Sequence, residues 1–306
     1  MISAIKNQFM PTNDILVTVV VLSYNSSATV IETLNSIKEQ TYNNIELIIT
    51  DDGSSDTTIE ICRRWLDLNG KTFSNYNLIT VESNTGLPAN CNRALYVSKG
   101  EWIKFIAADD TLKNECIEVN LKYISENKEV KLLQTNADMF EDFFVKENFK
   151  ITLPNNFNEF FNLRDGIKQF EFLKNVGYPL CTPSVFFKKS IIVDVGGFDE
   201  RFRFMEDMPL WFNLTRLGIK FYYHPISTVN YRSHNKSIAS DGKKYMNAKF
   251  AKGAYFFLKT YFPKDERGNR IKRLMLQLKF IAMLDNYGFN NNSILSKFLY
   301  AACNRL

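Results

Sequence analysis

The sequence has few of the residues that build metal-centred or disulfide-bonded folds. Only two histidines, His224 and His234, occur among 306 residues, so a histidine-rich metal site is excluded. Five cysteines are scattered without any CxxC pair, which excludes a zinc finger or a disulfide scaffold and favours reduced thiols in a cytoplasm. The sequence also shows no internal repeat and no low-complexity tract.

Long apolar runs and an even charge distribution are missing as well. The best apolar run, residues 15–22, is about half as long as a membrane span. Residues 1–14 hold no apolar segment typical of a secretory signal, so we expect a cytoplasmic protein. The net charge of +5 is uneven, because residues 242–306 carry +10 and the rest of the chain carries −5.

The first half of the chain alternates between short β-branched runs and amphipathic segments. This alternation predicts right-handed crossovers and a mostly parallel sheet with helices on both faces. Ser26 or Ser27 is expected to cap the first helix, and residues 57–60 form a candidate capping box for the second. Strands are expected at 15–22, 45–50, 77–82, 101–107 and 131–136, with helices at about 26–40, 57–67 and 89–98 and after Asp110 to about 127.

Beyond residue 136 the pattern is less regular. Residues 137–180 are rich in aromatics and show no clean period. A strand is expected at 184–187, a helix at 208–217 and a strand at 219–224. Three amphipathic helices are expected at about 243–262, 267–287 and 292–303, and they carry the excess positive charge.

Polar and acidic residues follow four successive predicted strands. Ligands of parallel sheets bind at the carboxyl ends of the strands, so these residues are expected to form one binding rim. Polar turn residues are also ordinary helix caps, and only their recurrence at four strand ends favours a site. The four groups are Ser23-Tyr24-Asn25, Asp51–Asp56, Asn84-Thr85-Gly86 and Asp109-Asp110.

The pair Asp109-Asp110 is the sharpest feature of this rim. Adjacent carboxylates repel one another and at a buried edge need a cation. Hard oxygen ligands suit Mg²⁺ or Mn²⁺, which typically bind one or two carboxylates together with substrate phosphates. The same pair also has an alternative interpretation as a helix cap.

In their order and spacing, segments 22–58, 84–95, 99–110 and 195–214 resemble the family 2 glycosyltransferases. The resemblance covers about residues 15–240. It implies a GT-A fold, with a mixed, mostly parallel sheet and helices on both faces. It further implies a catalytic domain over 1–240, with a nucleotide-binding half at 15–136 and an acceptor half at 137–240, followed by a basic helical region at 241–306.

The resemblance also implies roles for the rim residues. Ser23, Tyr24 and Asn25 match the loop that holds base and ribose, and Asn84 and Gly86 belong to the same donor-binding rim. Asp52 matches the acid that accepts a hydrogen bond from the base, which for uracil is donated by N3–H. Asp109 and Asp110 match the region that contacts ribose and holds the metal on the diphosphate.

Two positions depart from the family pattern. Ala107 stands where relatives have a further Asp, so which of Asp109 and Asp110 holds the metal stays open. Cys91 stands where many relatives have a base-contacting Arg. Arg93 lies two residues further on and is expected to point elsewhere on the helix. These departures leave open an alternative function, that of a membrane-peripheral nucleotide-binding module with a decayed site.

The resemblance extends to the reacting groups. Glu206-Asp207 match the paired acids on the acceptor side, with Asp207 as candidate base and Glu206 as its orienter. Pro209 suits the first turn of a helix, so Asp207 is alternatively a cap. Arg232, His234 and Ser237 are candidate phosphate contacts, with His234 also a candidate metal ligand. The alternative for this segment is a solvated basic loop.

Together these features predict an inverting transferase that requires Mn²⁺ or Mg²⁺. It would move a hexose or N-acetylhexosamine from a UDP-sugar to a lipid-linked or polysaccharide acceptor, in bacterial O-antigen or capsule synthesis. The basic helices are expected either to pack on the catalytic domain or to lie on an anionic inner membrane surface. No nucleic acid is expected as a partner, and nucleotidyl transfer is disfavoured because the first loop lacks glycine and basic residues.

Overall fold

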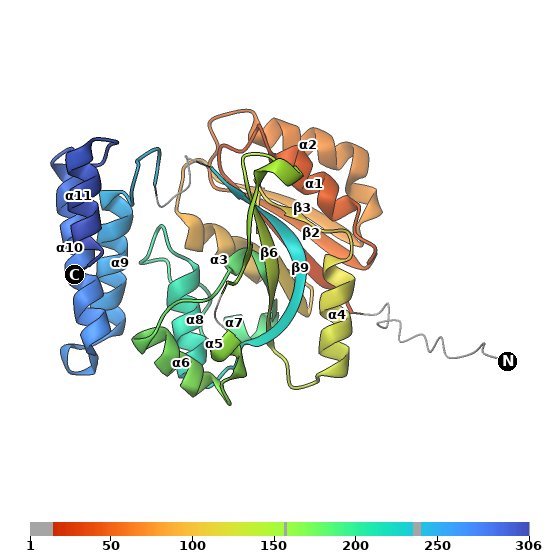
Figure 1. The fold of residues 1–306 in the computed structure, drawn as a ribbon. Helices are drawn as coiled ribbons and strands as arrows, with labels where there is room; N and C mark the ends of the chain where they lie inside the picture. The colour runs from red at the N-terminus through yellow and green to blue at the C-terminus, as the bar shows by residue number, and fades with distance from the viewer. Residues whose placement is uncertain (1–14, 156–157, 235–239, 306) are drawn as a thin grey trace.

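A computed structural model describes residues 15–155, 158–234 and 240–305. Its centre is a single mixed sheet in the order β3-β2-β1-β4-β8-β6-β9-β5, with β7 paired to β6. Helices cover both faces of this sheet (Figure 1). The predicted mostly parallel α/β fold is therefore confirmed.

The first half of the sheet consists of four parallel strands. β1 is buried along nearly its whole length because both of its faces are covered, which explains its unbroken apolar sequence. Val19 and Val21 pack against the helices of one face and Val20 against those of the other. The elements are β1 (Val17–Ser23), α1 (Val30–Lys38), β2 (Ile45–Asp51), α2 (Thr58–Asn69), β3 (Asn75–Thr80), α3 (Leu87–Val97), β4 (Trp102–Ala107) and α4 (Cys116–Glu126).

The second half completes the sheet with strands of both directions. β8 lies antiparallel between β4 and β6, while β9 runs parallel to β6 and pairs with the short β5. Its elements are β5 (Thr111–Leu112), β6 (Leu132–Glu141), β7 (Phe149–Leu153), α5 (Asn158–Asn162), α6 (Gly166–Asn175), β8 (Val185–Lys188), α7 (Lys189–Val193), α8 (Asp207–Arg216) and β9 (Tyr222–Ser233). Short 3₁₀ turns lie at Gly70–Thr72, Lys146–Asn148, Thr182–Ser184 and Lys264–Glu266.

Three helices follow the sheet, as the sequence predicts: α9 (Ala248–Tyr261), α10 (Asn269–Asn286) and α11 (Ile294–Cys303). They stand side by side at one edge of the molecule, with α9 nearest to the sheet and its covering helices (Figure 1). Phe257 and Phe262 are buried and lie with ring centroids 5.5 Å from that of Phe212 on α8. None of the described helices is both long and apolar enough to cross a membrane.

Several local expectations are wrong. The strand expected at 219–224 continues through Pro225 to Ser233, so residues 231–233 are part of β9 and not of a loop. The helix expected directly after Asp110 is preceded by β5, and the strand expected at 131–136 continues to Glu141. Thr29 is the N-cap residue of α1 in place of Ser26 or Ser27. Thr57 is at the expected N-cap position of α2, but its side chain makes no cap bond.

Candidate functional site

The loops after β1 and β2 are joined by hydrogen bonds at the carboxyl edge of the sheet. Asn25 has a positive φ of 49° and donates its backbone N–H to Ser54 Oγ, at 2.7 Å. Its side-chain oxygen accepts the N–H of Ser55 at 2.9 Å. Tyr24, which directly precedes Asn25, is 49% exposed, so its ring is free to stack on a planar ligand.

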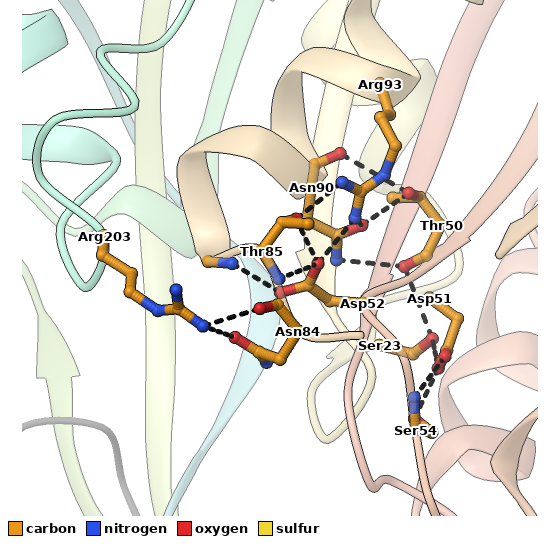
Figure 2. A network of polar contacts seen from close by, with 11 residues as sticks. Ser23, Thr50, Asp51, Asp52, Ser54, Asn84, Thr85, Asn90, Arg93 and Arg203 are labelled. Carbon is orange, nitrogen blue, oxygen red and sulfur yellow. Dashed lines mark hydrogen bonds and ion pairs between the residues drawn. The ribbon is translucent and has the colours of Figure 1, made fainter. Parts of the chain in front are cut away.

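Asp51 and Asp52 have their carboxylates occupied by protein donors (Figure 2). Asp51 accepts hydrogen bonds from Ser23 Oγ at 2.8 Å and from the backbone N–H and hydroxyl of Ser54. Ser23 is 1% exposed, so its hydroxyl supports the loop rather than facing a ligand. Asp51 thus holds the loops after β1 and β2 in place, a role that the sequence did not indicate.

Asp52 is the centre of the loop after β3. Its Oδ1 accepts from Thr85 N–H, Thr85 Oγ1 and Arg93 Nη2, and its Oδ2 accepts the N–H of Gly86 at 2.8 Å. Burial acts to raise the pKa of Asp52, but the hydrogen bonds from Thr85 and Arg93 outweigh it and hold the pKa below its ordinary value. Asp52 is therefore an ionised acceptor with capacity left on Oδ2.

The expectation that Arg93 points away from the site is wrong. Its Nη2 lies 2.7 Å from Asp52 Oδ1 and 2.9 Å from Asn90 Oδ1, and its Nη1 donates to Thr85 Oγ1. The side chain is long enough to cross from α3 to the strand end, and helical spacing alone does not reveal this. Cys91, in contrast, is buried and contributes no polar contact to Asp52.

Arg203 joins the loop after β3 to the loop that precedes α8. Its Nη2 donates to both the backbone O and the Oδ1 of Asn84, at 2.6 and 2.8 Å (Figure 2). The backbone O of Arg203 accepts the N–H of Leu87. Gly86 is required here, because its φ is 102° and a Cβ would lie 2.6 Å from Arg203 Cγ.

Asp109 and Asp110 occupy the turn after β4, and α1 holds this turn in place. Thr29 Oγ1 donates to Ala108 O and Thr33 Oγ1 to Asp110 O, each at 2.7 Å. Asp110 is 1% exposed; its Oδ1 accepts Arg232 N–H, while its Oδ2 is buried without a hydrogen-bond partner. Burial, and then the charge of Asp109, raises the pKa of Asp110 well above its ordinary value.

The end of β9 brings Arg232 and His234 to the same turn, because β5 pairs with β9 directly after Asp110. Arg232 donates from Nε to Asp109 O at 2.7 Å and from its two terminal nitrogens to Asp142 O and Glu32. Its guanidinium also lies 4.1 Å from the centre of the Phe144 ring. These donors meet protein acceptors, which differs from the expectation that Arg232 contacts phosphate.

His234 lies with Nε2 2.9 Å from Asp109 Oδ2, and both side chains are about 30% exposed. The hydrogen bond with Asp109 raises the pKa of His234, against the opposing effect of burial. A carboxylate and an imidazole at this spacing fit a divalent cation with oxygen ligands from a substrate. No group of three or more acidic, His or Cys side chains suits a metal within the described residues. Ser237 lies outside them.

Glu206 and Asp207 stand at the start of α8. Glu206 is the N-cap residue and makes no side-chain cap bond, so the alternative of Asp207 as the cap is wrong. Asp207 Oδ2 accepts from Tyr178 OH at 3.0 Å and Thr182 Oγ1 at 2.8 Å. Burial, and then the charge of Asp207, raises the pKa of Glu206 to about 8.

Burial raises the pKa of the buried Cys91 thiol well above its ordinary value, and the negative charges of Glu206, Asp207 and Asp52 raise it further against the opposing charge of Arg93. A separate polar cleft of about 470 Å³ opens along α8 and contains none of the predicted site residues. It is lined by residues that include Asn92, Asp199, Arg201 and Tyr261.

The model of the family described as glycosyl transferase family 2 matches residues 18–192. The Escherichia coli protein UDP-Glc:alpha-D-GlcNAc-diphosphoundecaprenol beta-1,3-glucosyltransferase WfaP is 27% identical over 233 residues, which cover 74% of this chain and 80% of WfaP. Two other curated relatives match over only 36% and 34% of their own lengths.

Solved structures resemble the fold along almost the whole chain. S. aureus TarS 1–349 in complex with UDP has a TM-score of 0.57 at 17% identity, covering 94% of this chain and 78% of that TarS chain. Mannosyltransferase PcManGT from Pyrobaculum calidifontis, in complex with GDP-Man and Mn²⁺, has the same TM-score at 15% identity, covering 96% of this chain and 81% of PcManGT. These similarities confirm the expected GT-A fold.

Proposed function

Because this chain belongs to glycosyl transferase family 2, we propose that it transfers a hexose or N-acetylhexosamine from a UDP-sugar to an acceptor hydroxyl with inversion of the anomeric carbon. The observation that carries the proposal is that an ionised Asp52 and the Asp109-Asp110 turn follow strands at one sheet edge, and that Arg203 bonds this edge to the loop before Glu206-Asp207. Each of these groups provides one of the functions that glycosyl transfer requires.

The nucleotide would be selected at Asp52. Its Oδ1 is occupied by three protein donors, whereas Oδ2 accepts only Gly86 N–H. A carboxylate held in its ionised form only accepts, so Oδ2 would favour uracil N3–H over the bare N3 of cytosine. Tyr24 and Asn25 would face the base and ribose. The UDP complex of TarS, a structural neighbour, agrees with this choice.

The diphosphate would be bound at Asp109 with a divalent cation, Mn²⁺ or Mg²⁺. Asp109 and His234 are the residues that would hold the ion, since both are partly exposed and lie 2.9 Å apart. Asp110 is buried and accepts the N–H of Arg232, so it would fix the turn rather than bind the ion. The bound ion would stabilise the charge of the departing nucleotide diphosphate. PcManGT, another neighbour, is described with Mn²⁺.

The acceptor would be activated by Asp207. Tyr178 and Thr182 donate to its Oδ2, which orients the carboxylate while Oδ1 accepts the N–H of Met208. Glu206, with its pKa raised to about 8, would be protonated at neutral pH and able to donate to a sugar oxygen. A base opposite the leaving group implies inversion, and general-base help is typically worth about 10²–10⁴ in rate.

The acceptor is proposed to be lipid-linked or a growing polysaccharide of a bacterial surface, because the WfaP name specifies a diphosphoundecaprenol acceptor. Such a substrate lies at the inner face of the cytoplasmic membrane, where we place the enzyme as a peripheral protein. We divide the chain into a nucleotide-binding half at 15–136, an acceptor half at 137–240 and a basic helical region at 241–306.

The test is a donor panel. Purified protein is incubated with UDP-, GDP- and dTDP-sugars, with Mn²⁺ or EDTA, and nucleotide release is scored with and without a membrane lipid extract. We expect release from one UDP-sugar that EDTA abolishes. Asp207→Asn should lower release about 10²–10⁴-fold while UDP still raises the melting temperature. No release from any donor, and no stabilisation by UDP, would instead support a membrane-peripheral module whose nucleotide site has decayed.

A further inference from the structure

The outward side of α11 is apolar. Its buried residues recur at spacings of four and three, as expected for one helix face. On the opposite side, Ile294 is 86% and Phe298 is 70% exposed, and Leu295 is 54% exposed beside them. A surface helix normally turns polar residues outward, so large apolar side chains gathered there mark an interaction surface.

α10 extends this apolar surface. Arg273 Nη2 donates to Arg305 O at 2.9 Å and Gln277 Nε2 donates to Cys303 O, so the end of α11 lies along the beginning of α10. The helices therefore run antiparallel, and the start of α11 lies near the end of α10. Tyr287, directly after α10, is 75% exposed. The apolar patch comprises Leu276, Met283, Tyr287, Ile294, Leu295 and Phe298.

A groove of about 450 Å³ between α9 and α10 adjoins the patch. Met283 and Tyr287 belong to both. Lys252 and Lys279 line the same groove, and Lys279 Nζ lies 5.0 Å from the centre of the Tyr255 ring. The groove thus combines an apolar floor with cationic rims, which is the combination that an amphipathic anion requires.

Positive charge around the patch is not offset within the three helices. Their single acid is Asp285. Its Oδ2 accepts the N–H of Ala248 at the start of α9, at 2.7 Å, and its Oδ1 lies 3.7 Å from Lys243 Nζ. The exposed basic residues of α9, α10 and α11 are Lys249, Lys252, Lys259, Lys272, Arg273, Lys279 and Lys297.

We propose that the apolar patch docks on an anionic lipid surface, with the surrounding lysines against the headgroups. Charge complementarity favours a lipid surface, because apolar side chains enter the interface while lysines attract anionic lipid. The inference rests on the proposed function in that a lipid-linked acceptor lies at such a surface. It assigns membrane attachment to α10 and α11 and leaves the donor site free to act.

The experiment is vesicle flotation of the full chain. The vesicles are phosphatidylglycerol–phosphatidylcholine mixtures or phosphatidylcholine alone, each at low and high salt. We expect at least about tenfold more binding to the anionic vesicles, weakened by salt. The double variants Ile294→Ser/Phe298→Ser and Lys279→Glu/Lys297→Glu should each lose about tenfold of that binding. Leu68→Ser is the matched control, because Leu68 is 84% exposed on α2 and far from the patch in sequence.

Folding and catalysis are scored separately. Each variant must keep its melting temperature and its stabilisation by UDP with Mn²⁺, so that lost binding is not lost folding. Vesicle binding without nucleotide release would overturn the proposed function alone, and release without vesicle binding would overturn the docking surface alone. Equal loss for Leu68→Ser would also overturn it. So would a dimer, seen by light scattering, that Ile294→Ser/Phe298→Ser dissolves while no vesicle binding occurs.

Discussion

Two Asp-Asp pairs follow strands of the same parallel sheet edge, yet they find their partners in different places. Asp51-Asp52 is surrounded by donors from the protein, including Ser23, Thr85 and Arg93. Asp109-Asp110 has fewer, and the buried Oδ2 of Asp110 has no hydrogen-bond partner. Asp51 is satisfied within the folded chain and Asp52 keeps acceptor capacity only on Oδ2, whereas the second pair leaves Asp109 partly exposed, where the proposed ion would bind.

The electrostatics of the two pairs differ in the same sense. Hydrogen bonds outweigh burial at Asp52 and lower its pKa, whereas burial and the charge of Asp109 raise the pKa of Asp110. A carboxylate that accepts several hydrogen bonds is stable in its ionised form, whereas a buried carboxylate with an unpaired oxygen tends to bind a proton or a cation. The two Asp-Asp pairs are identical in sequence, so their different roles can be recognised only from the groups that surround them in the fold.

The largest expected effect separates the pairs by function. Asp109→Asn should lower nucleotide release about 10³-fold, because a ligand that places a Lewis acid is worth several kcal/mol. The melting temperature of the protein alone should change little, since Asp109 is partly exposed. Activity assays and calorimetry on the same preparation measure both. If Asp109→Asn released nucleotide as fast as the wild type at every metal concentration, Asp109 would not be a ligand of the ion.

Asp51→Asn should have the opposite profile. The amide would set an N–H group against the donors of Ser23 and Ser54 in a fully buried position. We expect a loss of about 1–3 kcal/mol in the free energy of unfolding, while the response to Mn²⁺ is kept. Urea denaturation provides the measurement. A variant as stable as the wild type would show that the first pair is not a scaffold.

A smaller effect tests how the donor rim is joined to the acids at α8. Arg203→Met should raise the KM for the sugar nucleotide and lower kcat by roughly tenfold, because hydrogen bonds from a charged group are worth about 1.5–3 kcal/mol and the side chain is exposed. Arg201→Met is the control, since Arg201 pairs with Asp199 two residues earlier in the same loop and does not contact Asn84. Equal values of KM and kcat for Arg203→Met and Arg201→Met would contradict the role of Arg203 in joining the two loops.

A further prediction concerns stability and pH at Glu206. Its pKa of about 8 lies above the ordinary 4.5, so the folded state binds the additional proton between these values. Stability linked to the neutral form is complete below pH 4.5 and is lost as pH rises towards 8. Glu206→Gln should therefore gain stability relative to the wild type as pH rises through that window. Parallel melting curves at every pH would argue against the raised pKa.

The sequence predicts the sheet and the rim because both depend on local patterns. Buried strands such as β1 and β2 are continuous apolar runs, and the residues after them must reach one edge. Arg93 and Arg203 were not predicted as partners of Asp52 and Asn84, because their long side chains join segments that no periodicity connects. The extent of β9 was missed for a related reason: its pairing with β6 and β5 carries the strand past Pro225.

The most direct test of the two-pair account is a melting experiment with UDP and Mn²⁺. Wild type, Asp51→Asn and Asp109→Asn are each heated with UDP alone, Mn²⁺ alone and both together. We expect UDP with Mn²⁺ to raise the melting temperature of the wild type and of Asp51→Asn by similar amounts, and Asp109→Asn to lose the increment due to Mn²⁺. An unchanged Mn²⁺ increment in Asp109→Asn, or its loss in Asp51→Asn, would contradict this division of roles between Asp51 and Asp109.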